Sequence, residues 1–284
     1  MNISYKNLFI GIVCLLLLQG CISFNPKHIS YQDFGSKPND TFRIASYNID
    51  WGDSGWPHNN RLETIHAIKI VNADVILFQE SSRSWKKILL RELGQQYPYY
   101  IFEQVEGRGI AILSKFPITT KKYLTSSSGW YPAWVGEVDT KWGKFSLANF
   151  YLIPTILSKD APKHIKPYSI WEAQSIRTQQ INEYFLQLKD DLPLIIAGDF
   201  NQDTRGVDDD MFKELGFGKA ESYLQEPINT WYWPVGPFYV VDYFDHVYYQ
   251  TSEFKVVNVQ VLQEGASDHF PIVVDFVFMD HHSK

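Results

Sequence analysis

The stretch LIIAGDFNQD, residues 194–203, changes abruptly from apolar to polar side chains. Its first four residues predict a buried strand, and Gly198, Asp199 and Asn201 follow at the carboxyl end of that strand. In sheets built from alternating strands and helices, this edge is where ligands bind. The sequence therefore predicts that a functional site begins at Asp199.

Further strands and helices place this stretch in a mixed α/β (α+β) fold. Strand-like runs occupy residues 42–48, 74–79, 109–114, 144–152, 193–198, 246–249 and 271–278. Apolar residues recur at helical spacing from Leu62 to Ile68 and from Ile181 to Leu188. One sheet does not comfortably hold so many strands, so we expect two packed sheets flanked by helices.

The composition limits the class of protein. The chain has 284 residues, of which 45% are hydrophobic and 16% aromatic, enough to bury the core of one large domain. Its formal net charge of −6 argues against a protein that coats nucleic acid non-specifically, because such binding depends on clustered Lys and Arg. Residues 42–279 contain no repeat and no linker, so we expect them to form a single domain.

The amino terminus has the features of an export signal. Lys6 precedes an apolar run, residues 8–18, that is too short to span a bilayer, and the sequence Leu-Gln-Gly-Cys ends at Cys21. This pattern resembles a bacterial lipoprotein signal, in which Cys21 becomes the lipid-bearing first residue. An uncleaved anchor and an ordinary secretory signal are the alternatives. The expected organisation is a signal peptide over residues 1–20, a tether over 21–41, a folded domain over 42–279 and a disordered tail over 280–284.

This organisation predicts a protein outside the cytoplasm, anchored to a bacterial membrane through Cys21. Ile22 is compatible with sorting to an outer membrane, if the host has one. The other cysteine, Cys14, lies in the predicted signal, so the folded domain has neither a disulfide nor a thiolate metal site.

Polar residues recur where the predicted strands end or begin. They are Asn48, Asp50, Glu80, Tyr151, Asp199, Asn201, Asp245, Asp268 and His269. If the strands converge, one edge collects several carboxylates and amides, which suit a hard cation such as Mg²⁺. So many like charges would repel one another without a cation or a network of donors.

Seven motifs in this order carry a resemblance to a known family. They are YNIDWG, FQE, GIAILSKFPI, NFYLIP, GDFN, FDHVYY and SDHFPI, spread between residues 42 and 278. The set resembles the endonuclease/exonuclease/phosphatase superfamily of metal-dependent phosphoesterases. The resemblance implies a DNase I-like fold, a four-layer sandwich of two packed mixed β-sheets flanked by helices, and a catalytic domain over residues 42–279.

The resemblance also implies a metal site. Glu80 corresponds to the main carboxylate ligand of Mg²⁺, for which Mn²⁺ can substitute. Asn48, Asp50 and Asp268 would lie close to the same ion or to its waters.

Four further residues correspond to the catalytic groups of the superfamily. Asp199 would orient or deprotonate the attacking water, and Asn201 would donate to the phosphoryl oxygens. His269, paired with Asp245, would hydrogen-bond a phosphate oxygen, and the carboxylate would favour the protonated imidazole. The implied chemistry is in-line attack of water on phosphorus.

Tyr151 departs from the commonest pattern of the superfamily. Many members read N-T-H-L where this chain reads Asn149-Phe150-Tyr151-Leu152. Tyrosine at this position resembles the apurinic-endonuclease and exonuclease III branch. A phenol can donate a hydrogen bond to phosphate, but it is a weaker acid than imidazolium near neutral pH.

A calcium loop is a competing interpretation of the opening stretch. Asp199, Asn201 and Asp203 reproduce its D-x-N-x-D start, and Asp210 falls at its twelfth position. The sixth position is Thr204 rather than Gly, and a strand precedes where a helix is required. We therefore set this interpretation aside and expect the acidic run 208–210 to be a solvated helix start.

Aromatic and basic residues add weaker hypotheses. The aromatic residues are expected in loops before strands, where they contact substrate, insert into a lipid interface or anchor the core; they are Trp130, Tyr131, Trp134, Trp231, Tyr232 and Trp233. Arg108 and Arg205 are candidate phosphate clamps by loop position. His246, His281 and His282 are expected at the surface or the terminus.

Two functions of different classes follow from the sequence. The first is a monomeric phosphodiesterase, with no protein partner implied, that acts on nucleic acid or on a phospholipid or small phosphodiester. The second is a lipoprotein binding module that retains the fold without catalysis. The completeness of the proposed catalytic set favours the enzyme.

Overall fold

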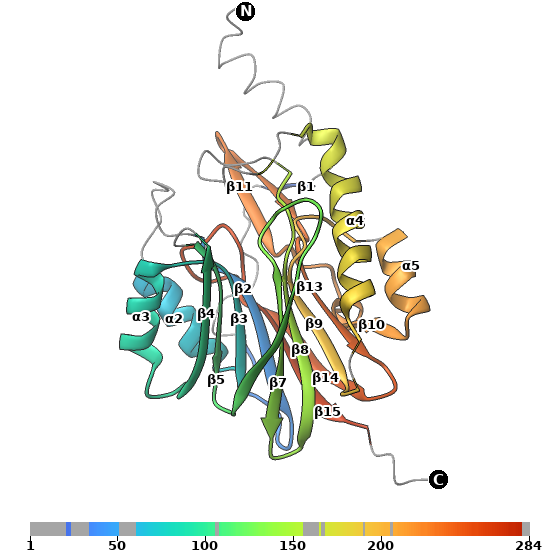
Figure 1. Cartoon of the computed structure of the whole chain (residues 1–284). Coiled ribbons are helices and arrows are strands. Elements are labelled where there is room, and N and C mark those ends of the chain that lie inside the picture. Colours follow the sequence, from blue (N-terminus) through green and yellow to red (C-terminus); the bar gives the residue numbers. More distant parts are fainter. Residues whose placement is uncertain are drawn as a thin grey trace, which may run out of the picture.

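The computed structural model describes most of the predicted domain (Figure 1). The described residues are 21–23, 34–50, 61–105, 108–155, 165, 168–189, 191–204 and 207–279. The predicted signal peptide and the predicted tail, residues 280–284, lie outside this part of the chain. Among the described residues, no helix combines the length and the apolar character needed to cross a membrane.

Two six-stranded mixed sheets form the body of the molecule. The first has the order β14 (Phe254–Val261), β15 (Ile272–Phe278), β2 (Phe42–Asn48), β3 (Val75–Ser82), β5 (Arg108–Ser114) and β4 (Tyr99–Val105). The second has the order β10 (Phe217–Lys219), β13 (Asp245–Gln250), β9 (Leu194–Asp199), β8 (Gly143–Tyr151), β7 (Ala133–Thr140) and β6 (Ile118–Leu124). In each sheet one central pair, β2 with β3 and β8 with β9, is parallel.

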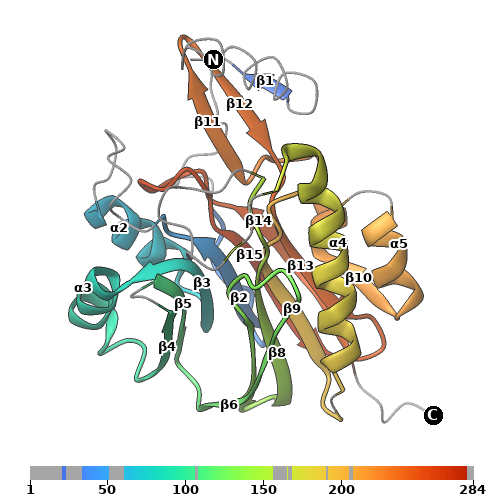
Figure 2. The ribbon, with the colours of Figure 1, turned by 45° about the horizontal axis from the view of Figure 1, so that its top comes forward.

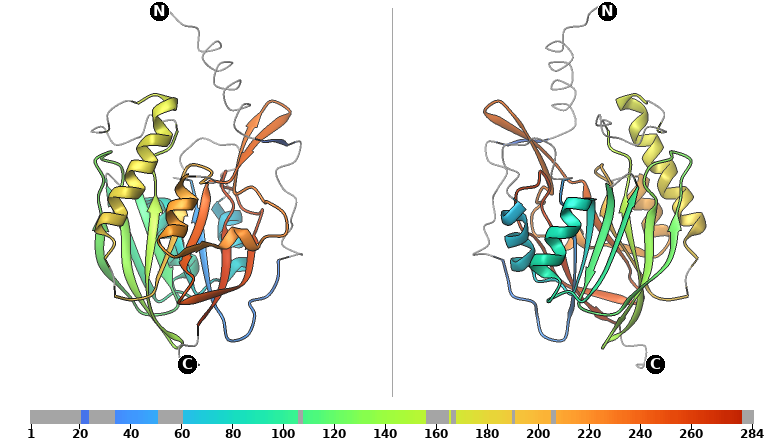
Figure 3. Two further views of the ribbon diagram at one scale, coloured as in Figure 1. Left: turned by 90° about the vertical axis from the view of Figure 1, so that its right-hand side faces the viewer. Right: turned by 60° about the vertical axis from the view of Figure 1, so that its left-hand side comes forward.

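Helices cover the outer face of each sheet (Figures 1 and 3). Helices α2 (Arg61–Val71) and α3 (Arg83–Leu93) pack on the first sheet through residues such as Ile68 and Trp85. Helices α4 (Ile170–Gln187) and α5 (Val207–Glu214) pack on the second, where Tyr184 contacts Phe150. The largest core lies between the sheets. The predicted two packed sheets flanked by helices are therefore confirmed.

A third, smaller sheet stands out from this body (Figure 2). It has the order β1 (Cys21–Ser23), β12 (Phe238–Asp242) and β11 (Trp231–Val235). The turn between β11 and β12 contains Gly236, whose φ of 61° suits glycine. The expectation that residues 231–233 lie in a loop was wrong, because aromatic residues and Val on both sides of this turn form a hairpin.

Several further elements were not expected from the sequence. Strand β6, with the sequence ITTKKYL, alternates between half-buried and exposed residues, so it carries no apolar run. The short 3₁₀ helix η2 (Ala220–Tyr223) was also missed. Part of the predicted tether packs on the domain, since Lys37 Nζ lies 2.7 Å from Asp74 Oδ2 and Phe34 contacts the core under α2 and α3.

A buried ion pair joins two neighbouring strands of the first sheet. Arg43 on β2 and Asp275 on β15 are partners in the antiparallel register. Arg43 donates from Nε to Asp275 Oδ1 at 2.7 Å and from Nη2 to Oδ2 at 2.9 Å. Both side chains are almost completely buried. Removal of Arg43 would therefore leave the buried Asp275 carboxylate without a counter-charge and with Asn258 Nδ2, 3.1 Å away, as a neutral donor.

We expect Arg43→Met to lower the free energy of unfolding by about 3–5 kcal/mol, because Asp275 would stay buried and unpaired. Urea denaturation of the two proteins measures the difference. The double variant Arg43→Met/Asp275→Leu should recover most of the loss, since it removes both charges. A loss below about 1 kcal/mol in the single variant would show that this pair behaves like a surface ion pair.

Candidate active site

The topology brings the ends of five strands to one edge of the molecule. Asn48 is the last residue of β2, Tyr151 the last of β8 and Asp199 the last of β9. Asp245 begins β13 and lies directly opposite Asp199 in the antiparallel register. Glu80 lies in β3, the parallel neighbour of β2. The two packed sheets thus present their polar ends to each other, as the sequence predicted.

The amide of Asn48 connects the two sheets. Its Nδ2 donates to Glu80 Oε1 at 3.1 Å and to Asp199 Oδ2 at 2.9 Å. Its Oδ1 accepts from the backbone N–H of Asp50 at 3.0 Å. Asn48 is buried, and both its Nδ2 and its Oδ1 form hydrogen bonds within the protein. One side chain therefore fixes the spacing between a carboxylate of the first sheet and a carboxylate of the second.

Glu80 lies at an irregularity of β3. Its φ is 55°, and the pairing of β3 with β5 shifts register between Phe78 and Ser81. Such an irregularity re-aims a side chain. Asp50 and Asn201 also have positive φ, 46° and 52°. Backbone strain of this kind often gathers at functional sites, where the surrounding structure holds it in place.

The carboxyl group of Glu80 is poorly stabilised as an anion. Burial, followed by the negative charges of Asp268 and Asp50, raises its pKa to about 8. Hydrogen bonds from Asn48 Nδ2 and Tyr151 Oη offset only part of this cost. A bound cation would restore the charged form, so the surroundings of Glu80 fit a metal ligand.

Asp199 is held by donors on both carboxylate oxygens. Oδ1 accepts from the Asn201 backbone N–H at 2.8 Å, and Oδ2 accepts from Asn201 Nδ2 at 3.1 Å as well as from Asn48. The preceding Gly198 lets β9 approach β8 closely, because a Cβ there would lie 1.9 Å from the Phe150 carbonyl oxygen. Burial raises the pKa of Asp199 well above its usual range.

His269 and Asp245 form a buried pair beside Asp199. His269 Nδ1 lies 2.8 Å from Asp245 Oδ2, and His269 Nε2 lies 3.8 Å from Asp199 Oδ2. Burial lowers the pKa of the imidazole, but the charges of Asp245 and Asp199 outweigh it, so the net pKa is well above the ordinary value. His269 is therefore a cation near neutral pH, with Nε2 directed toward Asp199.

The structure thus brings all nine predicted site residues together. Tyr151 donates to Glu80 Oε1 at 3.0 Å, and burial followed by the charge of Glu80 raises the pKa of Tyr151 well above its usual range. Tyr151 is consequently a neutral donor. Asp245 pairs with His269, as the resemblance implied.

Sequence reasoning missed the residues that hold this set in place. Trp231 Nε1 donates to Asp268 Oδ2 at 3.1 Å, and Trp85 Nε1 donates to the carbonyl of Asp50 at 2.7 Å. Ser267 Oγ donates to the carbonyl of Asn48 at 2.8 Å and accepts from the His269 backbone N–H. Ser267 lies inside a quoted motif, and Trp231 is among the aromatic residues expected to contact substrate, insert into lipid or anchor the core. Nothing in the sequence indicated its bond to Asp268 or the bond from Trp85 to Asp50.

The other aromatic residues proposed for loops are mostly core residues. Trp134 lies in β7, is fully buried and donates to Thr120 Oγ1 at 2.9 Å. Trp130 and Tyr131 are buried next to Tyr151, with ring centroids 5.5 and 5.8 Å away. Trp130 and Tyr131 therefore support Tyr151 from the core.

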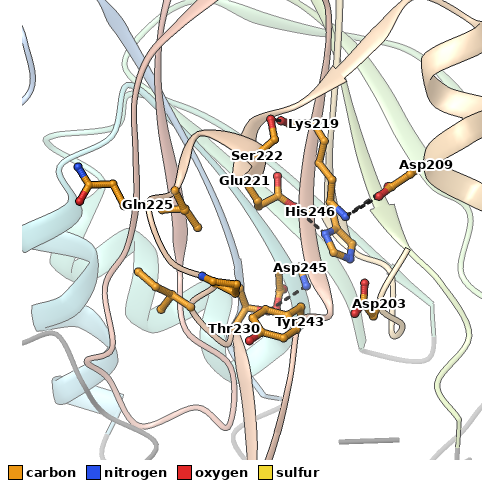
Figure 4. A pocket seen from close by; sticks show the side chains of 13 residues that line it. Asp203, Asp209, Lys219, Glu221, Ser222, Gln225, Thr230, Tyr243, Asp245 and His246 are labelled. Atoms are coloured by element: carbon orange, nitrogen blue, oxygen red, sulfur yellow. Dashed lines mark hydrogen bonds and ion pairs between the residues drawn. The ribbon is translucent and has the colours of Figure 1, made fainter. Parts of the chain in front are cut away.

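The expected surface position of His246 was wrong. His246 is buried on β13, with Nδ1 2.6 Å from Glu221 Oε1 and Nε2 2.9 Å from the carbonyl of Gln202. It lines a cavity of about 460 Å³ on which Asp245 also borders (Figure 4). Lys219 Nζ lies 3.2 Å from Asp209 Oδ2 in the same cavity, so its charged groups largely pair with one another.

The expected solvated helix start was also partly wrong. Asp208 is buried and accepts from Gln202 Nε2 at 2.6 Å and Thr178 Oγ1 at 3.0 Å. Asp210 lies in α5, and Asp199 faces the site, so these residues do not form a calcium loop. Arg205, His281 and His282 lie outside the described residues, as does the side chain of Arg108 on β5.

Solved structures with the same fold have low sequence identity to the chain. An endonuclease/exonuclease/phosphatase from Beutenbergia cavernae DSM 12333 is 17% identical, with a TM-score of 0.65 over 84% of this chain and 72% of that chain. The human Nocturnin catalytic domain with bound sulfate is 18% identical, with a TM-score of 0.61 over 84% and 94%. D. rerio TDP2 complexed with single-strand DNA product is 16% identical, with a TM-score of 0.62 over 84% and 99%.

Sequence comparison gives the family. No curated protein sequence matches the chain. Residues 45–269 match the sequence model of the Endonuclease/Exonuclease/phosphatase family, and this range covers most of the domain. The chain therefore belongs to the endonuclease/exonuclease/phosphatase family.

Proposed function

We propose that the chain is an extracytoplasmic, Mg²⁺-dependent phosphodiesterase that cleaves its substrate by in-line attack of water on phosphorus. Members of its family are phosphoric ester hydrolases and generally depend on a divalent metal. The observation that carries the proposal is the amide of Asn48. It joins Asp199, a buried base, to Glu80, a carboxylate whose surroundings call for a cation.

Glu80, with Asn48, Asp50 and Asp268, is our choice for the metal ligands. These groups offer oxygen donors, which suit Mg²⁺. The donor atoms of Asp199, Asp245 and His269 also lie within 4.8 Å of one another. We favour Glu80, because His269 Nδ1 and Asp245 already hydrogen-bond each other. The ion would supply positive charge to the phosphoryl oxygens in the transition state.

Asp199 is the residue best placed to orient the attacking water. Three donors fix its carboxylate, so the lone pairs that remain point in a defined direction. Its raised pKa makes it a stronger base than an exposed carboxylate. Both Nδ2 hydrogens of Asn201 are used, one by Asp199 Oδ2 and one by the carbonyl of Leu152, so Asn201 would have to exchange one of these bonds to donate to a phosphoryl oxygen.

His269 supplies a fixed positive charge. Asp245 holds Nδ1, so Nε2 can donate to a non-bridging phosphate oxygen of the substrate. Tyr151, in place of the histidine found in many members, is a neutral group whose O–H donates to Glu80 Oε1, so it would donate to phosphate only on releasing Glu80. The imidazolium of His269 and the ion would thereby neutralise the phosphate charge, and Asp199 would accept the proton of the attacking water.

The substrate class follows less directly from the site. The TDP2 structure holds single-strand DNA product, and nucleic acid is accordingly one candidate. A phospholipid or a small phosphodiester is the other, and the predicted lipoprotein signal ending at Cys21 supports an extracytoplasmic substrate. A non-catalytic binding module would not need a base held by three donors.

Asp199→Asn should lower the hydrolysis rate of bis-p-nitrophenyl phosphate by roughly 10²–10⁴-fold, because the amide keeps the shape but cannot accept a proton. The rate is measured with Mg²⁺, and EDTA should abolish it. The matched control is Asp210→Asn, which changes an exposed acidic residue on α5 and should leave the rate unchanged. Undiminished hydrolysis in Asp199→Asn or in EDTA would contradict the mechanism.

Mg²⁺ affinity should rise by about tenfold per pH unit between pH 6 and 7.5, because the ion must displace the proton of Glu80, whose pKa is about 8. Titration calorimetry at several pH values measures this slope. Without metal, the folded state holds the Glu80 proton more tightly than the unfolded chain, whose pKa is near 4.5. Stability should therefore fall as the pH rises from about 4.5 to 8.

Glu80→Gln is the matched control for both measurements. It should bind Mg²⁺ more weakly, with an affinity that depends little on pH. Without metal, its free energy of unfolding should fall less than that of the unmodified protein between about pH 4.5 and 8. Unchanged Mg²⁺ affinity in Glu80→Gln would place the ion elsewhere, with Asp199, Asp245 and His269 as the next candidate set.

A further inference from the structure

The tip of the β11–β12 hairpin has an unusual surface for an acidic protein. Residues 231–241, WYWPVGPFYVV, contain no Asp, Glu, Lys or Arg. Trp233 and Phe238 are each 40% exposed, although both are large aromatic residues. Aromatic side chains with apolar neighbours and no charge are typical of surfaces that enter the interfacial zone of a bilayer.

The hairpin stands at the end of the molecule that carries the site (Figures 2 and 3). The amino-terminal end of α4 reaches the same end of the molecule (Figure 1). Trp171, in the first turn of α4, is 70% exposed. Three exposed aromatic side chains therefore belong to elements that end on the side where substrate must enter.

The base of the hairpin is fastened to the site. Trp231 donates to Asp268 Oδ2 and forms an isolated β-bridge with His269. Tyr232 stacks on Phe270, with ring centroids 4.9 Å apart and an interplanar angle of 17°. The four residue steps from Trp231 to Val235 span about 13 Å. The tip is therefore held at a set distance from Asp268 and His269.

The amino-terminal segment meets the same hairpin. In the register of β1 with β12, Cys21 pairs with Val241 and Ser23 with Tyr239. Val241 is three residues from Phe238, or about 10 Å along the strand. Interfacial segments bury about 5–10 Å into the headgroup and acyl boundary. An anchor at Cys21 would thus lie at the membrane surface while the tip reached into the interface.

We propose that the β11–β12 hairpin inserts its tip into a lipid bilayer and holds the site at the level of the headgroups, so that the substrate is the phosphodiester of a phospholipid. This inference rests on the proposed phosphodiesterase function and names its substrate class. With about 13 Å between tip and site and 5–10 Å of insertion, the catalytic edge stands within the headgroup region.

Charge argues against nucleic acid as the occupant of this face. Nucleic-acid binding is dominated by Lys and Arg contacts to phosphates. The hairpin supplies none from residue 231 to 241, and the chain carries a net charge of −6. Binding to a zwitterionic lipid surface does not require Lys or Arg contacts, and transfer of aromatic side chains to that surface is favourable.

A fluorescent label at the tip tests insertion directly. The full chain with Cys14→Ala and Cys21→Ser has no other cysteine, so Pro237→Cys, an exposed turn residue, can carry a single environment-sensitive dye. With phosphatidylcholine vesicles, we expect its emission to shift to shorter wavelength and rise severalfold. The same dye at Ser252→Cys, in the turn at the other end of β13, should not change, which separates insertion of the tip from attachment through residues 8–18.

Phe238→Asp tests the consequence for the substrate. It should weaken vesicle binding by the tip and hydrolysis of vesicle phosphatidylcholine by about tenfold or more. Tyr100→Asp, which changes a 48% exposed aromatic residue on β4, is the matched control and should change neither. Hydrolysis of soluble bis-p-nitrophenyl phosphate reports on the proposed function separately in each protein.

Each outcome decides a different point. An unchanged dye signal at Pro237→Cys, in a protein that still cleaves the soluble diester, overturns insertion and leaves the proposed function standing. Insertion without phospholipid hydrolysis overturns the substrate class, as does DNA hydrolysis without a dye response. If the unmodified chain does not hydrolyse the soluble diester with Mg²⁺, the result counts against the proposed function instead.

Discussion

The burial of several carboxylates at one edge is the constraint on which the rest of the structure depends. Asp199 and Asp245 are fully buried, and Glu80 lies among Asp50 and Asp268. Unpaired buried charges would cost several kcal/mol each. The amides of Asn48 and Asn201 and the imidazole of His269 offset part of that cost, and the remaining excess of negative charge lies around Glu80. The way the sheets meet therefore creates an edge whose charge suits a bound cation.

The same constraint explains why the two sheets pack in one arrangement. Asn48 belongs to the first sheet but donates to Asp199 of the second, and Gln79 Nε2 of the first donates to Asn149 Oδ1 of the second at 2.7 Å. A slip of one residue would break these bonds and turn apolar side chains out of the central core. Apolar burial drives the sheets together, and the buried amides fix their register.

Apolar runs explain how much of this was predictable. The strands that end in Asn48 and Asp199 are buried along their length, so the sequence showed both them and the polar residues that follow. Strand β6 is half exposed and the hairpin strands flank a Gly-Pro turn, so neither has a buried apolar run. The position of Glu80 depends on a local irregularity, and the contact of Trp231 with Asp268 joins residues 37 apart in the chain. Both arise only from tertiary packing.

The way the hairpin is attached bears on how substrate choice arises in this fold. A mobile loop could carry aromatic residues to a bilayer, but it would leave the site at a variable height. Here Trp231 stacks on Phe244 at 4.8 Å, Tyr232 stacks on Phe270, and both flank the segment that carries Asp268 and His269. Packing of this kind transmits position, because stacked rings in a dense interior have little freedom to slide. If the tip inserts as proposed, the hairpin would select a substrate by the distance of its phosphate from the membrane, while the site would recognise the phosphodiester itself.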